Sequence, residues 1–292
     1  MIVVKISDGL GNQIFQYAYA RWLQTQTWQK IYLDVSDINR MADSSSDVKK
    51  RIELCDKRKY QLNNLRITLP VIDQKIKSEI FQKESKANKF WNYCRKLRLL
   101  PVVYMNETMC NEAGFRFSWW QNYYVEGCFF DKKYYEKAFG LLNFELRLKE
   151  KIAISEELQS ILLNRNTVSL HVRRGDFLKY ERAVRDISES DYYMKAMDYI
   201  KDKISNPFLL IFSDDIEWVR ENMCFELEHR MISGQGYSDC EELILMSMCK
   251  NNIIANSTFS YWGAWLNPNR EKIVVSPRGW KMKIIPDTWV QL

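Results

Sequence analysis

Short runs of apolar residues alternate along the chain with longer segments of helical periodicity, and this alternation limits the fold more than any other feature. Runs that are apolar throughout, such as Phe208–Phe212, are typical of strands buried on both faces, and strands joined by helices pair in parallel. We therefore predict an α/β fold with parallel sheets. The strands are expected at Ile2–Ser7, Ile31–Leu33, Tyr123–Glu126, Thr167–Val172, Phe208–Phe212, Ile253–Ala255 and Lys272–Val275. The main helices are expected at Gln13–Thr27, Asp191–Ile204, Asp214–Asn222, Glu241–Cys249 and Phe259–Leu266.

The alternation occurs in two series, which are separated by a polar and irregular region between residues 40 and 120. A chain of 292 residues is long enough for two domains. We expect one α/β domain at residues 1–150 and a second at residues 151–292, with a cleft between them and the boundary near residues 145–165.

The composition is that of an ordinary globular protein, because 46% of the residues are hydrophobic and 27% are charged. The longest stretch without charge, Asn251–Asn269, contains five Asn and a Pro, so no membrane span is expected. The pattern of a secretion signal is absent, and the seven Cys form no C-x-x-C pair. These features predict a cytoplasmic protein with reduced thiols. The two His argue against a His-based zinc or iron site.

Positive charge is concentrated in Lys75–Arg98, where eight basic residues accompany two acidic ones. Phe90, Trp91, Cys94 and Leu97 could form an apolar stripe there, which predicts an amphipathic helix. The ordinary interpretation is a solvated helix packed on its own domain. The alternative is a peripheral contact with the inner face of a membrane or with a lipid-linked phosphate. Nucleic acid is not an expected partner, because the net charge is only +6.

Gly9-Leu10-Gly11-Asn12-Gln13-Ile14 follows the first expected strand and opens a helix. Together with Asp34 it matches two-thirds of the G-x-G-x-x-G dinucleotide fingerprint, so a nicotinamide-dependent oxidoreductase is one alternative. Ile14 stands where the third glycine belongs, which weakens this alternative. The glycines still let backbone approach a ligand, and the helix N-terminus offers free N–H groups.

His171-Val172-Arg173-Arg174-Gly175-Asp176 lies at the carboxyl end of an expected strand, the edge where open α/β sheets bind ligands. Adjacent arginines suit a diphosphate, because guanidinium is permanently charged and binds oxygens bidentately. The alternative is a loop held by an Arg–Asp ion pair.

Two further strand ends carry polar side chains. Asp214 and Asp215 could bind a ribose or a base, hold a metal, or cap the next helix. Ser257 and Thr258 begin another helix, where hydroxyls act as caps and as phosphate ligands. The D-x-D spacing of metal-dependent sugar transferases is absent at this position. Together, the three strand ends predict a nucleotide-diphosphate site in the second domain.

These segments resemble a known family. Gly9–Ala18 is similar to the opening motif of the α-1,2-fucosyltransferases of glycosyltransferase family 11, and His171–Asp176 resembles the H-x-R-R-G-D signature that they share with α-1,6- and protein O-fucosyltransferases. Glu242–Cys249 and Ile253–Asn267 resemble the third block of the family. The chain departs from the family pattern at three positions, which are Asp8 for glycine, Tyr261 for tryptophan and Glu242 for aspartate. Residues 40–120 match no pattern of the family.

The resemblance implies a type B glycosyltransferase fold with two Rossmann-like domains. It implies inverting transfer of fucose from GDP-β-L-fucose, a co-substrate, to the 2-hydroxyl of a galactoside in a glycan or lipid-linked oligosaccharide, with no metal and no cofactor. It assigns Arg173, Ser257 and Thr258 to the phosphates and places His171 and Arg174 nearby. It also implies that a turn of the first domain, with Gly11, Asn12 and Gln13, faces the fucose and the acceptor.

Asp176 and Glu181 are the two candidates for the base that removes the acceptor proton, and the sequence does not choose between them. Asp176 could instead orient Arg173 or Arg174. A noncatalytic nucleotide- or sugar-binding protein with the same fold is a further alternative. The sequence carries no expectation for the oligomeric state.

Overall fold

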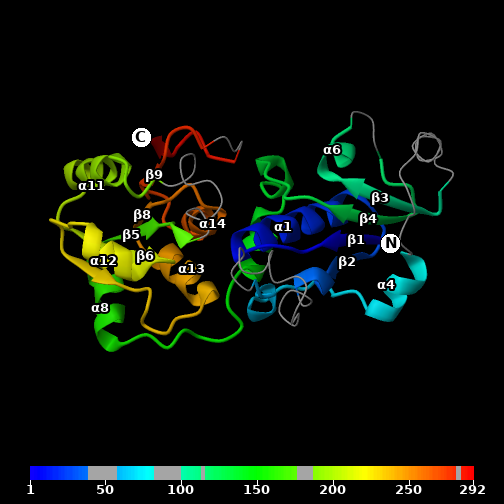
Figure 1. Ribbon diagram of the computed structural model, residues 1–292, viewed down its shortest axis with the longest axis horizontal. Coiled ribbons are helices and arrows are strands. Elements are labelled where there is room, and N and C mark those ends of the chain that lie inside the picture. The colour runs from blue at the N-terminus through cyan, green and yellow to red at the C-terminus, as the bar shows by residue number, and fades with distance from the viewer. Residues whose placement is uncertain (39–57, 82–99, 113–115, 176–186, 281–283) are drawn as a thin grey trace. The chain divides into compact units, whose positions relative to one another are not determined.

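The computed structural model describes residues 1–38, 58–81, 100–112, 116–175, 187–280 and 284–292. The chain forms two compact units (Figure 1). Of the described residues, unit 1 contains 1–38, 58–62, 67–81, 100–112 and 116–145, and unit 2 contains 63–66, 146–175, 187–280 and 284–292. Segment 63–66 joins unit 2 through backbone pairing, since the N–H of Arg66 donates to the carbonyl of Arg147 at 2.9 Å.

Unit 1 is built on a parallel sheet whose described strands have the order β2-β1-β4-β3. The strands are β1 (Ile2–Lys5), β2 (Ile31–Asp34), β3 (Val102–Asn106) and β4 (Asn122–Glu126). Helix α1 (Leu10–Gln26) packs against β1 and β2. Helix α4 (Gln74–Ile80) leads to Phe81, which packs with Val3, Tyr104 and Tyr124 on one face of the sheet. The short helices α6 (Glu107–Cys110) and α7 (Phe139–Glu145) complete the described part of this unit.

Helix α1 begins three residues earlier than the expected Gln13, so Gly11, Asn12 and Gln13 lie in its first turn. The carbonyl of Gly9 accepts the N–H groups of Asn12 at 3.0 Å and of Gln13 at 3.1 Å, which starts the helix. The expected helix in Lys75–Arg98 is described only as α4, and residues 82–98 lie outside the described residues.

Unit 2 contains a parallel sheet with the described order β10-β9-β8-β5-β6-β7. The strands are β5 (Asn166–Val172), β6 (Pro207–Ser213), β7 (His229–Met231), β8 (Asn251–Ile253), β9 (Val274–Ser276) and β10 (Val290–Gln291). The expected strand at Ile253–Ala255 is wrong by two residues, because Asn251 and Asn252 pair in β8 with Val168 and Ser169 of β5. Strands β3, β7 and β10 are not among the expected ones, because β3 lies in the irregular region between residues 40 and 120, and β7 and β10 have only three and two residues.

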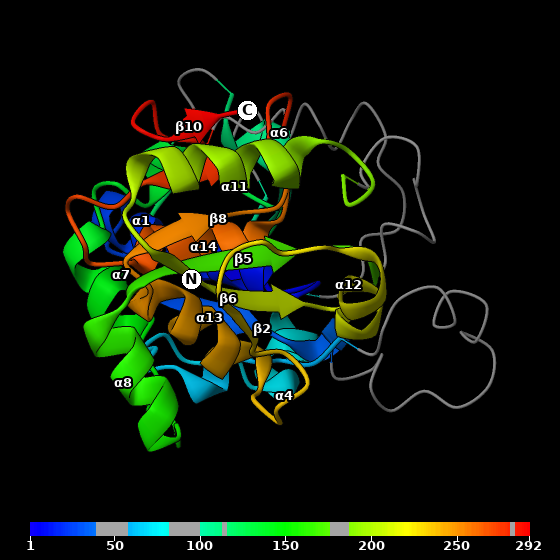
Figure 2. The same cartoon turned by 90° about the vertical axis from the view of Figure 1, so that its left-hand side faces the viewer.

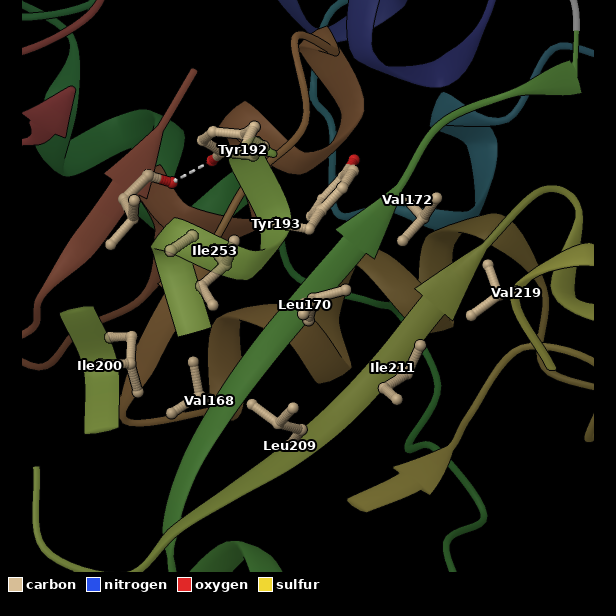
Figure 3. Packing of buried hydrophobic residues seen from close by; sticks show 12 residues of the cluster. Val168, Leu170, Val172, Tyr192, Tyr193, Ile200, Leu209, Ile211, Val219 and Ile253 are labelled. Carbon is tan, nitrogen blue, oxygen red and sulfur yellow. Dashed lines mark hydrogen bonds between the residues drawn. The ribbon is translucent and has the colours of Figure 1, made fainter. Parts of the chain in front are cut away.

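Helices cover both faces of this sheet, with α11 on one side and α8 and α13 on the other (Figure 2). The helices of this unit are α8 (Glu156–Asn164), α11 (Tyr192–Lys203), α12 (Ile216–Asn222), α13 (Asp239–Met248) and α14 (Thr258–Leu266). Successive residues of the central strands supply opposite faces: Leu209 and Ile211 pack toward α11 and α12, while Leu210 packs toward α8 and α13 (Figure 3). The double cover explains why β6 is apolar throughout Phe208–Phe212, whereas β5 carries three buried polar residues, Thr167, Ser169 and His171.

A buried polar network fixes β8 against the helices that flank it. The amide of Asn252 donates to Ser169 Oγ at 2.7 Å and to the carbonyl of Met246 at 2.9 Å. Asn267, which follows α14, donates to Asn252 Oδ1 at 2.8 Å. Satisfied buried amides of this kind specify one register, since a slip would leave them unpaired. In the described ranges every helix is too short or too polar to cross a lipid bilayer.

Candidate functional site

The candidate site of unit 2 lies at the carboxyl ends of β5 and β8. From β5 the chain proceeds outward to β6 and β7, and later returns to β8 on the other side of β5. Loops after β5 and β8 therefore turn away from each other, which creates the switch point at which open parallel sheets bind ligands. The rings of His171, near the end of β5, and Phe259, in the first turn of α14, have centroids 5.5 Å apart. The two predicted motifs are thus neighbours in space.

Arg174 is fixed by contacts on all sides and is only 4% exposed. Its guanidinium lies 3.5 Å from the centroid of the Trp218 ring, and its Nη1 donates to Ser188 Oγ at 2.5 Å. Its Nε lies 3.4 Å from Asp215 Oδ2. A buried guanidinium with these partners ties the loop after β5 to α12.

Arg173 has a more open environment. Its Nη1 forms an ion pair with Asp214 Oδ2 at 3.0 Å, and its side chain is 16% exposed. The other carboxylate oxygen of Asp214 accepts the backbone N–H of Arg174 at 2.9 Å. A Cβ at Gly175 would lie 2.4 Å from Asp214 Oδ2, so glycine is required for this close approach.

The two adjacent aspartates have different roles. Asp215 is the N-cap of α12 and accepts the N–H of Trp218 at 3.3 Å, as the capping interpretation predicts. Asp214 holds Arg173, and this is the Arg–Asp pair of the alternative interpretation. The described residues contain no group of three or more His, Cys, Asp or Glu arranged to hold a metal ion.

His171 is 3% exposed and lies at the end of β5. Burial, and secondarily the charge of Arg173, lowers the pKa of the imidazole to about 3, so the ring is neutral at pH 7. Among the described residues its Nδ1 finds no hydrogen-bond partner. A buried and unsatisfied ring nitrogen beside an arginine is suited to a polar ligand group.

Ser257 and Thr258 begin α14 next to His171. Ser257 is the N-cap and accepts the N–H of Phe259 at 3.3 Å, so its predicted capping role is confirmed. The first turn of α14 contains no acidic residue, which leaves the positive end of the helix dipole without a neighbouring carboxylate of its own. Arg173, His171 and this helix N-terminus together form an environment for an anionic ligand.

Three residues of the site were not predicted from the sequence as site residues. Ser188 and Trp218 hold Arg174, and the only sequence signal for Trp218 is its position one turn after Asp214. Glu242 of α13 accepts a hydrogen bond from Ser233 Oγ at 2.8 Å, and Ser233 accepts the N–H of Ser213 at the end of β6. Burial raises the pKa of Glu242 to about 7. The chain segment carrying Asp176 and Glu181 lies outside the described residues.

The predicted first-domain residues Gly11, Asn12 and Gln13 lie at the carboxyl edge of the sheet of unit 1. The amide of Gln13 donates to the carbonyls of Asp8 and Lys59, both at 2.8 Å, and accepts the N–H of Gln61 at 3.1 Å. Its side chain therefore holds backbone together. Asp8, which stands at a usual glycine position of the family, has φ of 64°, the left-handed conformation that glycine adopts most easily.

The nicotinamide alternative needs Asp34 to bind a ribose. Asp34 is 1% exposed, its Oδ2 accepts the hydroxyl of Tyr124 at 2.6 Å, and it also forms an ion pair with Lys77. The carboxylate is already satisfied inside unit 1, so the geometry does not support this alternative.

A cavity of about 420 Å³ opens at the same carboxyl edge of unit 1, beside the ends of β1, β3 and β4. The cavity is lined by residues that include two carboxylates, an amide and two hydroxyls, and these lining residues are Lys5, Ser7, Asn106, Glu107, Thr108, Glu126, Gly127 and Cys128. The amide of Gln16 braces its wall, because it accepts the N–H of Ser7 at 2.8 Å and donates to the carbonyl of Gly127 at 3.2 Å.

Comparison with known proteins extends these observations. The family model described as glycosyl transferase family 11 matches residues 1–283. The O-antigen biosynthesis glycosyltransferase WbnK of Escherichia coli is 33% identical, over 98% of this chain and 99% of its own length. An α-1,2-colitosyltransferase of Escherichia coli is 28% identical, over 100% of this chain and 99% of its own length.

The fold resembles that of the fucosyltransferase NodZ from Bradyrhizobium, with a TM-score of 0.54 and 13% identity over 91% of this chain and 93% of that chain. A crystal of NodZ, an α-1,6-fucosyltransferase, has been soaked with GDP-fucose. The expected type B glycosyltransferase fold is confirmed by this likeness and by the parallel sheets of both units.

Proposed function

The chain belongs to glycosyl transferase family 11, and from that premise we propose that it transfers L-fucose from GDP-β-L-fucose to the 2-hydroxyl of a galactoside, with inversion and without a metal ion. The observation that carries the proposal is that the loop with Arg173 and the N-terminus of α14 come together at the switch point of unit 2, where the ring centroids of His171 and Phe259 lie 5.5 Å apart. We assign residues 151–292 to donor binding and residues 1–150 to acceptor binding.

The diphosphate of the donor occupies the edge formed by Arg173, His171 and the first turn of α14. Arg173 contacts the β-phosphate, and the hydroxyls and N–H groups of Ser257 and Thr258 bind the remaining oxygens. Arg174 positions the loop that follows β5 and does not contact the phosphates, because its guanidinium is stacked on Trp218 and hydrogen-bonded to Ser188.

In the reaction, the bond between fucose C1 and the β-phosphate oxygen breaks, and its electron pair stays with GDP. The acceptor oxygen bonds to C1 from the opposite side, and its proton passes to a carboxylate, Asp176 or Glu181. Negative charge grows on the β-phosphate as GDP leaves, so Arg173 stabilises the transition state more than the ground state. The neutral ring of His171 can donate a hydrogen bond to the same phosphate.

The acceptor sugar binds in the 420 Å³ cavity of unit 1, whose lining offers carboxylates, an amide and hydroxyls for sugar hydroxyl groups. Glu126 is the test position, since its side chain is 55% exposed and its link to Lys5 is a single contact at 3.6 Å. Glu126→Gln should raise the KM for the acceptor and leave GDP affinity unchanged. An unchanged acceptor KM would remove this cavity from the proposal.

The decisive experiment is a transfer assay with the purified chain, GDP-fucose and soluble galactosides such as lactose and N-acetyllactosamine. Formation of a 2-linked α-fucoside, identified by NMR, is the expected result. GDP-colitose serves as a competing donor, because one full-length relative is a colitosyltransferase. A strong preference for GDP-colitose would correct the donor, and binding of GDP without transfer to any galactoside would contradict the proposed reaction.

The same assay in excess EDTA tests metal independence. Activity should persist, because Arg173 and the α14 N-terminus provide the positive charge that a metal ion would otherwise supply. Loss of transfer in EDTA that Mn²⁺ or Mg²⁺ restores would contradict this part of the proposal.

A further inference from the structure

Three tryptophans of unit 1 lie at the surface, and none of them is among the residues to which a role is assigned above. Trp28 is 104% exposed, Trp119 is 86% exposed and Trp120 is 44% exposed. All three line one concavity of about 790 Å³, together with Phe117 and Tyr32. Large exposed apolar side chains that gather in one place mark an interaction surface, whereas single ones need no explanation. We call this the tryptophan surface.

The tryptophan surface lies at the amino-terminal edge of the sheet. Trp28 precedes β2, and Trp119 and Trp120 precede β4, which is parallel to β1 and β2. This edge is opposite to the carboxyl edge that holds the 420 Å³ cavity and the first turn of α1. A β-strand rises by about 3.3 Å per residue, so a four-residue strand separates the two edges by roughly 13 Å.

The exposure of these indoles does not result from a loose loop. Ser118 and Gln121, which flank Trp119 and Trp120, are 7% and 2% exposed. The N–H of Ser118 donates to the hydroxyl of Tyr123 at 2.8 Å, and the amide of Gln121 donates to the carbonyl of Leu100 at 2.6 Å. The backbone is therefore anchored on both sides of the indoles, which are held outward.

The charge around the indoles has one sign. Lys30 and Arg116 line the concavity, and no carboxylate is among its lining residues in the described part of the chain. Trp combined with Lys and Arg is the composition that proteins place at a membrane–water interface, where indoles enter the headgroup layer and cations meet lipid phosphates. A site built for neutral sugars would also be expected to offer carboxylates for the hydroxyl groups, as the cavity at the carboxyl edge does.

We propose that the tryptophan surface docks unit 1 on the anionic headgroup layer of a phospholipid bilayer. The proposal goes beyond the transfer reaction. Docking in this way would hold the carboxyl edge of unit 1, to which we assign acceptor binding, about one strand length above the lipid. An acceptor attached to a lipid by a short glycan would then reach that edge without leaving the membrane.

The test is flotation of the full-length protein with vesicles of phosphatidylcholine alone or mixed with phosphatidylglycerol. We expect binding only to the mixed vesicles and weakening in high salt, because salt screens the attraction between charges. Trp28→Ser combined with Trp119→Ser should lower binding at least about tenfold, since interfacial binding scales with the apolar area inserted. Lys30→Glu combined with Arg116→Glu should also lower it. Brominated lipids should quench the fluorescence of the wild type and not of the double Trp variant.

Leu163→Ser is the matched control, because Leu163 is 69% exposed on α8 of unit 2, and it should bind vesicles like the wild type. Transfer to a soluble galactoside should be the same in all these variants, so failure of docking is distinguishable from failure of the proposed reaction. Melting temperatures verify that each variant is folded.

Four results of the flotation and light-scattering experiments would overturn the proposal. The first is that the wild type does not float with the vesicles, and the second is that the Trp and charge variants float as well as the wild type. The third is that flotation is lost only when Lys83, Lys86 and Lys89 are changed to Glu. The fourth is that light scattering finds the wild type as a dimer and the double Trp variant as a monomer. The third result would show that the membrane contact is made by the segment Lys75–Arg98, and the fourth would show that a second copy of the chain covers the indoles. Quenching by free oligosaccharide instead of lipid would identify a glycan platform and would also overturn docking.

Discussion

The guanidinium of Arg174 lies 3.5 Å from the centroid of the Trp218 ring, and this stacking separates the roles of two arginines that are adjacent in sequence. The side chain of Arg174 is 5% exposed and is surrounded by protein partners. The side chain of Arg173 is 16% exposed and pairs with Asp214 at the sheet edge. We therefore expect Arg173 to act on the donor and Arg174 to act on the fold.

Arg173→Ala should lower transfer by about 10²–10⁴, which corresponds to roughly 3–5 kcal/mol of transition-state stabilisation. Arg173→Lys should restore the activity only in part, because an ammonium cannot form the bidentate contact of guanidinium. Steady-state kinetics with GDP-fucose measure the effect. Arg220→Ala is the control, since Arg220 forms only an exposed ion pair with Glu217 in α12. Near wild-type turnover of a folded Arg173→Ala variant would refute the assignment.

Arg174→Ala should destabilise the protein by about 3 kcal/mol, because it removes the partner of the buried Ser188 and of Asp215 and empties the space over Trp218. A double-mutant cycle with Trp218→Ala should show a coupling of roughly 1–2 kcal/mol in urea unfolding. Arg165→Ala is the matched control, since Arg165 lies 4.9 Å from the centroid of the Phe208 ring but pairs with an exposed carboxylate. Equal unfolding midpoints for the Arg174 and Arg165 variants would contradict the separation of roles.

Gly175→Ala should impair activity through Asp214. The added methyl group would lie 2.4 Å from Asp214 Oδ2 and must displace the carboxylate that holds Arg173. We expect a loss of transfer of about tenfold or more, which corresponds to 1.4 kcal/mol or more. Gly140→Ala in α7 is the control, because its methyl group meets nothing within 4 Å and alanine favours a helix. If both alanine variants kept full activity, the close approach at Gly175 would have no functional role.

The base can be identified by comparing Asp176→Asn with Glu181→Gln. The true base, once neutralised, should lose transfer to the acceptor with little change in GDP affinity, because it acts only on the acceptor proton. Single-turnover transfer and GDP titration together measure both quantities. If both variants keep most of their activity, neither carboxylate is the base.

His171 should make stability depend on pH. Its pKa is lowered from 6.5 to about 3 by burial and by Arg173, so between these values the unfolded chain binds a proton that the folded chain does not. The stabilising contribution of His171 to the free energy of unfolding is therefore fully present above pH 6.5. It is lost as the pH falls toward 3, at about 1.4 kcal/mol per pH unit at most. Urea unfolding between pH 7 and pH 4.5 should show a smaller loss for His171→Gln than for the wild type.

Glu242 gives the free energy of unfolding the opposite dependence on pH. The effect of His171 is therefore taken from the difference between the wild type and His171→Gln. Burial raises the pKa of Glu242 from 4.5 to about 7, so between these values the folded chain binds a proton that the unfolded chain does not. The stabilising contribution of Glu242 is therefore present below pH 4.5 and is lost as the pH rises through 7. Because Glu242 is the same in the wild type and in His171→Gln, the difference between their curves reports His171. Parallel curves for the two proteins would mean that His171 is protonated in the folded state.

Much of the fold could be predicted from local pattern. The strands β1, β5 and β6 were predicted within two residues at each end, because short runs rich in apolar residues between helical segments are typical of strands in a doubly covered parallel sheet. A cap within each of the pairs Asp214/Asp215 and Ser257/Thr258 was also open to prediction, since a cap involves only residues two or three positions away, and the structure identifies Asp215 and Ser257 as the caps. The site at the end of β5 was predicted for the same reason: the motif and the strand are contiguous.

The tertiary structure alone decided everything that depends on residues distant in the sequence. It decided that Arg174 lies against Trp218 and Ser188 while Arg173 pairs with Asp214, a difference in contacts that two adjacent arginines in a sequence do not reveal. It also decided that β8 pairs with β5 two residues earlier than its apolar run suggests, because the amides of Asn252 and Asn267 find partners only in that register. Hydrophobic periodicity reports which residues are buried, whereas the partner of a buried polar or charged group is set by packing between elements that the sequence does not place side by side.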